Sequence, residues 1–193
     1  LPLHSSRELA DRKNLQPLEV GIISKPHTVG DRVFARRRKT DVVAMTWIFI
    51  DCDSGADPMP LAKALHGRDI AFILTESSTS RLGGSGIYKW HLFLPLAKPK
   101  QLAQHGPGVA VVETAEASAL WWGRVHAHVA ERVLRIGGLE SVAVDASADR
   151  MCQGVYIPHR PDASPARFLA PRKTSGARLL DLDAFPEATG FED

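Results

Sequence analysis

Residues 42–50, VVAMTWIFI, run without a break into Asp51, Cys52 and Asp53. The apolar stretch is rich in β-branched and aromatic residues and carries no charge, which predicts a strand buried on both faces in mid-sheet. Side chains alternate along a strand, so Asp51 and Asp53 project from one face where it emerges and Cys52 from the other. The stretch therefore brings two carboxylates to one point of the predicted sheet, with Cys52 as a small core residue.

Two carboxylates on one face repel each other, and a hard divalent cation relieves the repulsion. Oxygen ligands favour Mg²⁺ or Mn²⁺ over zinc, so the D-x-D pattern of Asp51 and Asp53 predicts a metal site. A structural alternative stays open, in which Asp51 caps the turn and Asp53 forms an Asx turn before Gly55. A second D-x-D, Asp181 and Asp183, follows a weaker strand, and we interpret it as structural.

The rest of the chain mixes helix and strand patterns without strict alternation, which predicts an α+β fold. Residues 115–136 carry an apolar stripe at helical spacing and end at the glycine pair 137–138, a C-cap signal. A shorter helix is expected at 57–65, with Asp57 as its N-cap and Pro58 in its first turn. The other expected elements are a helix at 7–14 and strands at 18–24, 70–77, 87–96, 141–145, 154–158, 168–170 and 178–183.

Residues 70–77 and 87–96 are expected to pair as antiparallel strands, joined by a polar loop at 78–86 that is too long for a tight turn. Pro95 and Pro99 are expected to stop the second strand, because proline donates no hydrogen bond to a sheet. The loop contains three glycines, whose backbone amides can approach an anion. We expect it to become ordered over bound phosphates, unless it is only a solvated connector.

The composition fits one globular domain of 193 residues, 44% hydrophobic and 24% charged. Residues 1–41 form its expected N-terminal part and 42–183 its motif-bearing core. No apolar run is long enough for a membrane helix, and the amino terminus lacks the apolar core of a signal peptide. We therefore expect a soluble, cytoplasmic protein. Cys52 and Cys152 are too few for a disulfide framework and form no C-x-x-C pair.

Arg36, Arg37, Arg38 and Lys39 form a basic run, and Arg160 lies among scattered basic residues of the carboxyl-terminal third. Such residues can neutralise the phosphates of a nucleic acid. Most basic runs are only solvated surface, however, and the net charge is +2. Composition alone therefore leaves nucleic-acid binding open.

Asp145 repeats the pattern of Asp51, because the apolar stretch 141–145 ends in a carboxylate. Three carboxylates at strand ends can hold two metal ions about 3.5–4 Å apart, the arrangement used in nucleotidyl transfer. Asp149 follows closely and is a rival for the same role. We expect Asp145 to join Asp51 and Asp53, because it ends an apolar strand directly.

His91 stands in the strand expected at 87–96 and shares its face with Lys89 by alternation. A cation and a hydrogen-bond donor beside a glycine-rich loop suit a triphosphate, whereas a lone strand histidine is more often a core residue. Both interpretations of His91 stay open. His126 and His128 lie inside the expected helix, where residues two apart point in different directions, so we interpret them as structural.

Three of these segments together resemble the archaeo-eukaryotic primase superfamily, the primase–polymerases. The hhhDxD motif of that family is matched by residues 49–53 (FIDCD), and its strand motif s-x-H by residues 89–91 (KWH). Its third motif, a hydrophobic residue followed by Asp, is matched by Val144 and Asp145. The resemblance covers roughly residues 42–183.

Residues 145–150 and 155–161 are also similar to phage and plasmid members, in which an Asp, an Arg and a Y-x-P-R stretch follow the third motif. The chain departs from the family at Lys89, where a small residue is usual. It also lacks the zinc-binding cysteines of some relatives and their helicase and accessory domains. These departures bear on the details of the nucleotide pocket and on the partners.

The resemblance implies an RRM-like antiparallel sheet with packed helices and a small N-terminal α/β module. Asp51, Asp53 and Asp145 would hold two Mg²⁺ or Mn²⁺ ions for nucleotidyl transfer in the replication of a plasmid, phage or related mobile element. The implied partners are a single-stranded DNA template, NTP or dNTP, and a replicative helicase or other replication-initiation protein. The expected nucleotide-binding residues are His91, Lys89, Arg150 and Arg81, and the expected nucleic-acid contacts are Arg36, Arg37, Arg38 and Arg160.

Two alternative functions come from other classes. A glycosyltransferase also uses D-x-D after an apolar strand to hold a metal and a nucleotide-sugar, but it needs neither a histidine strand nor a third strand-end acid. A non-catalytic nucleic-acid-binding module on a primase-like scaffold would bind DNA without metal-dependent nucleotide incorporation.

Overall fold

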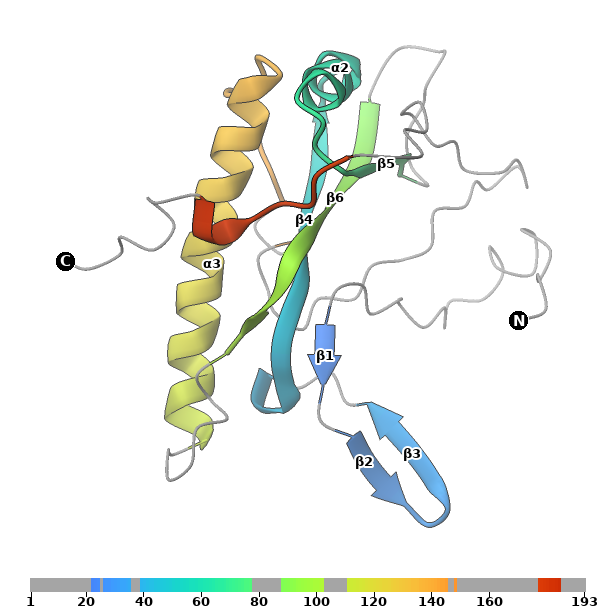
Figure 1. The fold of residues 1–193 in the computed structure, drawn as a ribbon, viewed down its shortest axis with the longest axis vertical. Coiled ribbons are helices and arrows are strands. Elements are labelled where there is room, and N and C mark those ends of the chain that lie inside the picture. Colours follow the sequence, from blue (N-terminus) through green and yellow to red (C-terminus); the bar gives the residue numbers. More distant parts are fainter. Residues whose placement is uncertain are drawn as a thin grey trace.

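The computed structural model describes residues 22–24, 26–35, 39–77, 88–102, 111–145, 148 and 177–184. In them, a four-stranded antiparallel sheet has the order β1-β4-β6-β5, and a two-stranded hairpin projects from one end (Figure 1). The elements are β1 (Ile22–Ser24), β2 (Pro26–Val29), β3 (Arg32–Ala35), η1 (Lys39–Asp41), β4 (Val42–Gly55), α2 (Met59–Gly67), β5 (Ile73–Glu76), β6 (Tyr88–Gln101), α3 (Val111–Ile136) and η4 (Leu182–Ala184). The expected α+β class is confirmed.

β4 contains the apolar stretch that predicted a buried strand, and it continues through both acids to Gly55. Asp51 pairs with His91 of β6, and Gly55 pairs with Tyr88. Gly55 has a φ of +82°, which glycine adopts readily because it has no Cβ. The register shifts between Cys52 and Gly55. The two acids therefore lie within the paired part of the sheet rather than beyond its edge.

β6 runs through both prolines to Gln101, so the expectation that Pro95 and Pro99 stop it is wrong. The Pro95 carbonyl oxygen accepts a hydrogen bond from the N–H of Leu180, on the edge of β6 that faces away from β4. β5 does not extend as far as Pro95, because the pair nearest to Pro95 joins Ile73 to Phe93. The nitrogen of Pro95 points to this edge, where β5 offers no partner, so the lack of an N–H costs no hydrogen bond between β5 and β6.

β5 and β6 pair antiparallel, as expected for residues 70–77 and 87–96. The strand in the first of these ranges is only Ile73–Glu76. Ile70 instead makes an isolated parallel bridge to Arg178. The expected strand at 178–183 is thereby reduced to bridges at Arg178 and Leu180, the latter to Leu96, followed by η4.

α3 begins at Val111, earlier than expected, and ends at Ile136 as predicted. Gly138 has a φ of +69°, and the N–H of Leu139 donates to the carbonyl oxygen of Leu134. This geometry confirms the predicted glycine C-cap. No helix among the described residues is long and apolar enough to cross a membrane.

α2 begins at Met59, and its N-cap is Pro58 rather than the expected Asp57. The Asp57 Oδ1 atom accepts a hydrogen bond from the N–H of Met59 at 3.0 Å, so the carboxylate forms an Asx turn just before the helix. The helix ends at Gly67.

The remaining expected elements are seen in part or lie outside the described residues. Of the strand at 18–24, the described part is β1, which pairs with β4. The strand at 141–145 is reduced to a single antiparallel bridge of Val144 with Cys52. The β2–β3 hairpin was not predicted. The helix at 7–14, the strands at 154–158 and 168–170, the loop at 78–86 and Cys152 lie outside the described residues.

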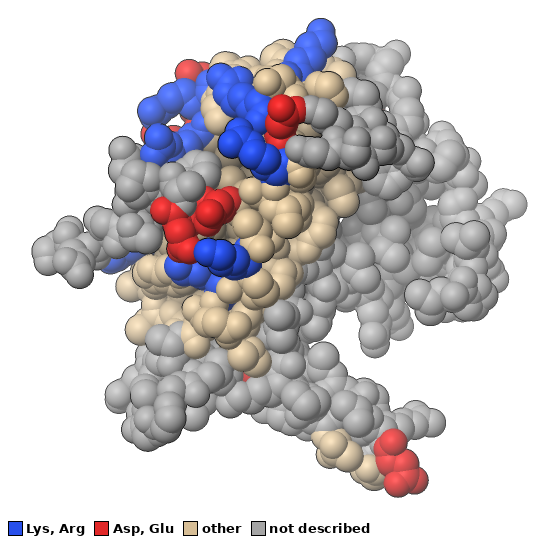
Figure 2. Space-filling view, viewed as in Figure 1, with Lys and Arg blue, Asp and Glu red and all other residues tan. Residues whose placement is uncertain are grey.

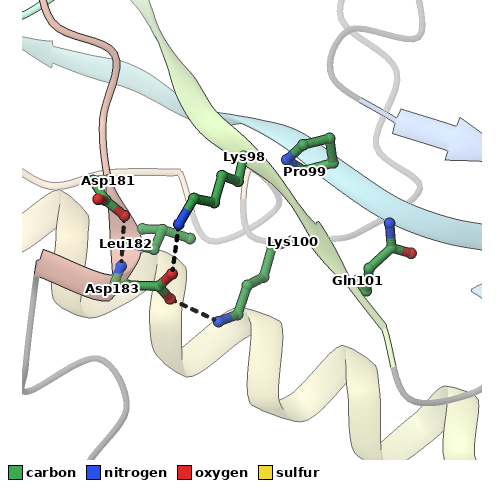
Figure 3. Close-up of a pocket in the computed structure, with 7 residues that line it drawn as sticks. All are labelled: Lys98, Pro99, Lys100, Gln101, Asp181, Leu182 and Asp183. Carbon is green, nitrogen blue, oxygen red and sulfur yellow. Dashed lines mark hydrogen bonds and ion pairs between the residues drawn. The ribbon is translucent and has the colours of Figure 1, made fainter.

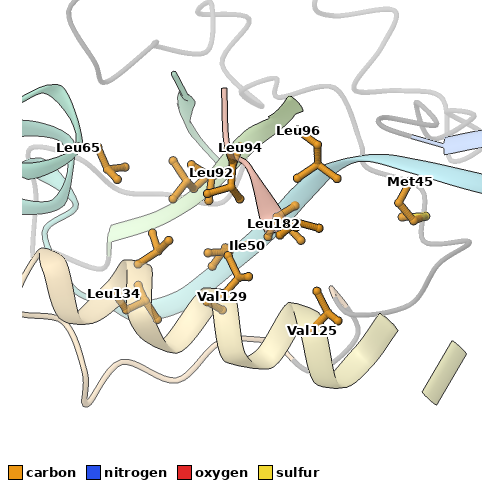
Figure 4. Close-up of a cluster of buried hydrophobic side chains, with 14 of the residues drawn as sticks. Met45, Ile50, Leu65, Leu92, Leu94, Leu96, Val125, Val129, Leu134 and Leu182 are labelled. Carbon is orange, nitrogen blue, oxygen red and sulfur yellow. The ribbon is translucent and has the colours of Figure 1, made fainter. Parts of the chain in front are cut away.

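The core lies between the sheet and its two helices, α2 and α3 (Figure 4). Alternate residues of β4 and β6 point into it and are fully buried, as are residues of both helices. The predicted stripe of α3 packs there, with Ile136 only half-buried at its end. The main contributors are Ile48, Ile50, Cys52, Leu61, Leu65, Trp90, Leu92, Leu94, Trp122, Val125, Val129 and Val133.

His126 of α3 is 3% exposed, and its Nε2 lies within hydrogen-bond distance of the carbonyl oxygen of Phe49. That carbonyl lies on the edge of β4 opposite β6, so the ring N–H donor fixes α3 against the strand. His128 is half-buried and lies two residues further along the helix. This arrangement agrees with the structural interpretation of the H-x-H pair.

Gly137 marks a close approach of the end of α3 to α2, and it gives a test of this packing. A Cβ at this position would lie 2.7 Å from the Cα and Cβ of Leu61. We predict that Gly137→Ala lowers the free energy of unfolding by about 1–3 kcal/mol, the usual effect of overpacking. Gly67→Ala is the control, because a Cβ there meets nothing within 4 Å. Urea titration of both variants measures the difference, and equal stability would refute the packing.

Candidate functional site

One face of the sheet, turned away from the core, carries the predicted catalytic residues. Asp51 of β4 pairs with His91 of β6, and His91 pairs in turn with Thr75 of β5. Residues directly opposite each other on neighbouring strands share a face. The His91 Nε2 atom lies 3.4 Å from Asp51 Oδ1, and the two side chains are 11% and 23% exposed. The predicted acid and the predicted histidine are thus brought together.

Asp145 lies on the other side of Asp51. Its N–H donates to the carbonyl oxygen of Asp51 at 2.9 Å. The antiparallel bridge between Cys52 and Val144 places Asp145 opposite Asp51 when the register is continued by one residue. The backbone therefore aligns Asp145, Asp51, His91 and Thr75 across the sheet. Asp51 and Asp145 meet there although they are far apart in the chain.

Asp53 and Lys89 form an ion pair on the same face. The Lys89 Nζ atom lies 3.1 Å from Asp53 Oδ1, and the two side chains are 28% and 53% exposed. An ion pair that is this open to water adds little stability. The ion pair places an ammonium group directly beside the second acid of the D-x-D pattern.

The described residues include carboxylates that suit a hard cation, but these side chains do not point to one common position. Within the described ranges, no three His, Cys, Asp or Glu side chains lie close enough together to hold a metal ion. Asp53 turns to Lys89 and Asp51 to His91, so each of the two carboxylates lies beside a basic side chain. All three acids are at least partly exposed. Oxygen-only donors of this kind fit Mg²⁺ or Mn²⁺, and metal binding stays a prediction.

Aromatic side chains form a wall along the same face next to His91. The ring centroid of His91 lies 5.4 Å from that of Phe49 and 6.4 Å from that of Phe93, and both contacts are edge-on. Trp47 continues the row with an edge contact to Phe93. These aromatics and Thr75 were not predicted to belong to the site. The alternation of side chains along residues 47–53 and 89–93 could have placed the aromatics on the same face as Asp51 and His91.

The contacts of the second D-x-D pattern agree with its structural interpretation (Figure 3). The Asp181 Oδ1 atom accepts a hydrogen bond from the N–H of Asp183 at 3.1 Å, which begins η4. The Asp183 carboxylate lies 3.8 Å from Lys98 Nζ and 3.5 Å from Lys100 Nζ. These residues line a cavity of about 280 Å³. Both lysines are thus engaged in holding η4 against β6.

A second cavity, of about 350 Å³, lies beside Asp145 between α3 and residues 142–144. Its walls include Ala130 and Leu134, and apolar walls of this kind suit a polyphosphate poorly. On the side of the molecule shown in Figure 2, the described acidic and basic side chains lie next to each other over the sheet and helices, and an acidic side chain also lies apart on the projecting hairpin. The sheet face is therefore the better candidate site.

Several expected ligand contacts lie outside the described residues, and their roles remain predictions. This group comprises Arg36, Arg37 and Arg38 of the basic run, Arg81 of the loop, and Arg150 and Arg160. Asp149, the rival of Asp145, also belongs to it.

The metal site can be tested without an activity assay. We predict that Asp51→Asn leaves the melting temperature in EDTA unchanged or higher, because it removes one of several neighbouring negative charges. The same variant should lose the rise in melting temperature that Mg²⁺ or Mn²⁺ gives the parent protein, since a ligand that binds only the folded state stabilises it. Thermal unfolding with and without metal measures both effects.

Asp183→Asn is the matched control, because it changes an acid of the structural D-x-D pattern. It should keep the full metal-induced rise. A rise retained in Asp51→Asn would contradict the metal-site hypothesis.

The arrangement of Asp51, Asp53, Asp145, His91 and Lys89 has to be judged by its own chemistry. It offers hard oxygen ligands, a ring nitrogen and an ammonium group on one sheet face. Neither a protein-family model, nor a curated protein, nor a solved structure matches this chain.

Proposed function

We propose that this chain is a small metal-dependent primase–polymerase domain, which transfers nucleotides onto a strand paired with a single-stranded DNA template. One observation carries the proposal. The three sequence segments that resemble the family motifs lie far apart in the chain, yet Asp51, His91 and Asp145 lie side by side across one sheet face. Such a meeting is required if they act on one ligand.

The order of the elements supports an RRM-like core. The chain runs β4, α2, β5, β6, α3 and then the bridge at Val144. In space, Val144 lies beside β4, followed by β6 and β5. This order supports a β-α-β-β-α-β arrangement with both helices on one face, in which the bridge at Val144 takes the place of the last strand. It leaves the opposite face, with the acids and His91, for a ligand.

In this proposal Asp51, Asp53 and Asp145 hold Mg²⁺ or Mn²⁺. The bound ions supply activation of the attacking 3′-hydroxyl and stabilisation of negative charge on the α-phosphate. The 3′-oxygen forms a bond to the α-phosphorus while the bond to the bridging oxygen breaks and pyrophosphate leaves. The role of the three carboxylates is to fix the positions of the reacting oxygens.

Lys89 and His91 act on the β- and γ-phosphates. Lys89 exchanges Asp53 for a phosphate oxygen when Asp53 turns to the metal, so neither charge is left without a counter-ion. The His91 Nε2 atom already points to the side of Asp51, where a ring N–H can donate to a phosphate oxygen. Arg81 and Arg150 are further proposed contacts, and a replicative helicase or other replication-initiation protein of a mobile element is the proposed partner.

A primer-extension assay tests the proposal. Labelled NTP or dNTP is supplied with single-stranded template, with and without primer, in Mg²⁺ or Mn²⁺. We predict that the parent protein incorporates nucleotide. Asp51→Ala should lower the rate of incorporation by more than about 100-fold, because the loss of a residue that only supports a metal ligand typically costs about 10- to 100-fold.

Normal polymerisation by an Asp51→Ala, Asp53→Ala double variant would refute the proposal. DNA binding without incorporation would favour the non-catalytic module. Transfer from a nucleotide-sugar, with no effect of DNA, would favour the glycosyltransferase.

The role of Lys89 gives a second prediction. Lys89→Gln should raise the KM for nucleotide about tenfold or more, because it removes a charged hydrogen bond to phosphate. The affinity for single-stranded DNA should stay within about twofold, as for a residue that does not contact the template. Lys98→Gln is the control, since Lys98 pairs with Asp183 away from the site. A change in DNA affinity equal to the change in KM would place Lys89 on the template instead.

A further inference from the structure

Two buried polar atoms of the site have no hydrogen-bond partner among the described residues. They are Nδ1 of His91 and Oγ1 of Thr75. The residues that carry them are 8% and 6% exposed. Burying a donor or acceptor without a partner is unfavourable, so two such atoms close together require an explanation.

The two residues face each other across the sheet. Thr75 of β5 pairs with His91 of β6 in the antiparallel register. The Cβ atoms of directly opposite residues lie about 4.5–5.5 Å apart, and the threonine hydroxyl is both a donor and an acceptor. At this separation, a rotation about χ1 of Thr75 can direct the hydroxyl toward the ring. A hydrogen bond between the two would satisfy both buried atoms at once.

The surroundings of the ring determine which atom donates. Nε2 of His91 lies 3.4 Å from Asp51 Oδ1, and a carboxylate can only accept, so the proton of the neutral ring belongs on Nε2. Nδ1 is then an acceptor, and the Thr75 hydroxyl is the donor that fits it. Phe49 and Phe93 pack edge-on against the ring, which restricts it to this orientation.

We propose that Thr75 is a positioning residue, whose hydroxyl donates a hydrogen bond to Nδ1 of His91 and keeps the ring proton on Nε2. Asp51, His91 and Thr75 then form one line across three strands. The hydroxyl touches no substrate. It orients Nε2–H toward Asp51, and, where the proposed function holds, toward a phosphate oxygen of the nucleotide. That last step rests on the proposed function, whereas the tautomer does not.

The tautomer is measured directly by long-range ¹H–¹⁵N NMR of the histidine rings in the protein without nucleotide. The His91 signals are assigned from their absence in His91→Gln. The parent protein and Thr75→Ser, which keeps the hydroxyl, should show one protonated and one unprotonated ring nitrogen, with the proton on Nε2. Thr75→Val keeps the shape of the side chain without the hydroxyl, and its His91 should show a mixture of tautomers.

Thr46→Val is the control for a threonine of β4 outside this line of residues, and it should leave the His91 signals unchanged. Thermal unfolding confirms that all variants fold. Identical His91 signals in Thr75→Val and the parent protein would overturn the proposal, as would a loss of the Nε2 tautomer in Thr75→Ser. A purely structural threonine would lower the melting temperature without changing the tautomer.

Nucleotide kinetics test the link to the proposed function separately. Thr75→Val should raise the KM for nucleotide about tenfold, with rescue in Thr75→Ser. A changed tautomer with an unchanged KM would support the positioning of His91 and overturn its role toward phosphate. An unchanged tautomer overturns the positioning whether or not the protein polymerises nucleotides.

Discussion

The antiparallel pairing of β4 with β6 is the interaction on which the described structure depends. It joins two strands of 14 residues each, and every neighbouring strand attaches to one of them. Its register decides which side chains share a face. With Asp51 opposite His91, the acids, Lys89 and His91 fall on one side together with a row of aromatics, and the fully buried core residues of both strands fall on the other. A shift by one residue would send Asp51 into the core, so burial of the apolar face also fixes the site.

The helices strengthen this division of the two faces. α2 and α3 pack on the apolar face alone, and His126 ties α3 to the backbone of Phe49 on the edge of β4. The segment after α3 returns to the same edge, where Asp145 bonds to the carbonyl oxygen of Asp51. A long helix is thus what carries the chain from the end of β6 to the far side of β4. The third acid reaches the site because α3 has the length to span the sheet.

Much of this arrangement could be predicted from local sequence patterns. The apolar stretch at 42–50 indicated the central strand, and the stripe and glycines of 115–138 indicated α3. What the sequence did not reveal depends on partners distant in the chain. Pro95 lies inside β6 because the edge it faces has no β5 to pair with, and no local pattern contains that fact. The β2–β3 hairpin was missed although Gly30, with a φ of +58°, stands at its turn. Thr75 has no signal of its own, since its importance comes only from facing His91.

The charges of the site bear on how a metal and a nucleotide would bind under the proposed function. Without ligands, Asp53 has Lys89 as its counter-ion, and Asp51 has the His91 ring beside it. A metal ion alone would draw Asp53 away from Lys89 and supply no negative group in its place. A triphosphate alone would place its charge beside three carboxylates. A metal–nucleotide complex supplies both signs together, so each ligand makes the binding of the other more favourable, and the coupling is reciprocal. Under the proposed function, the pairing of acids with basic residues on one sheet face would therefore favour the complex over either component.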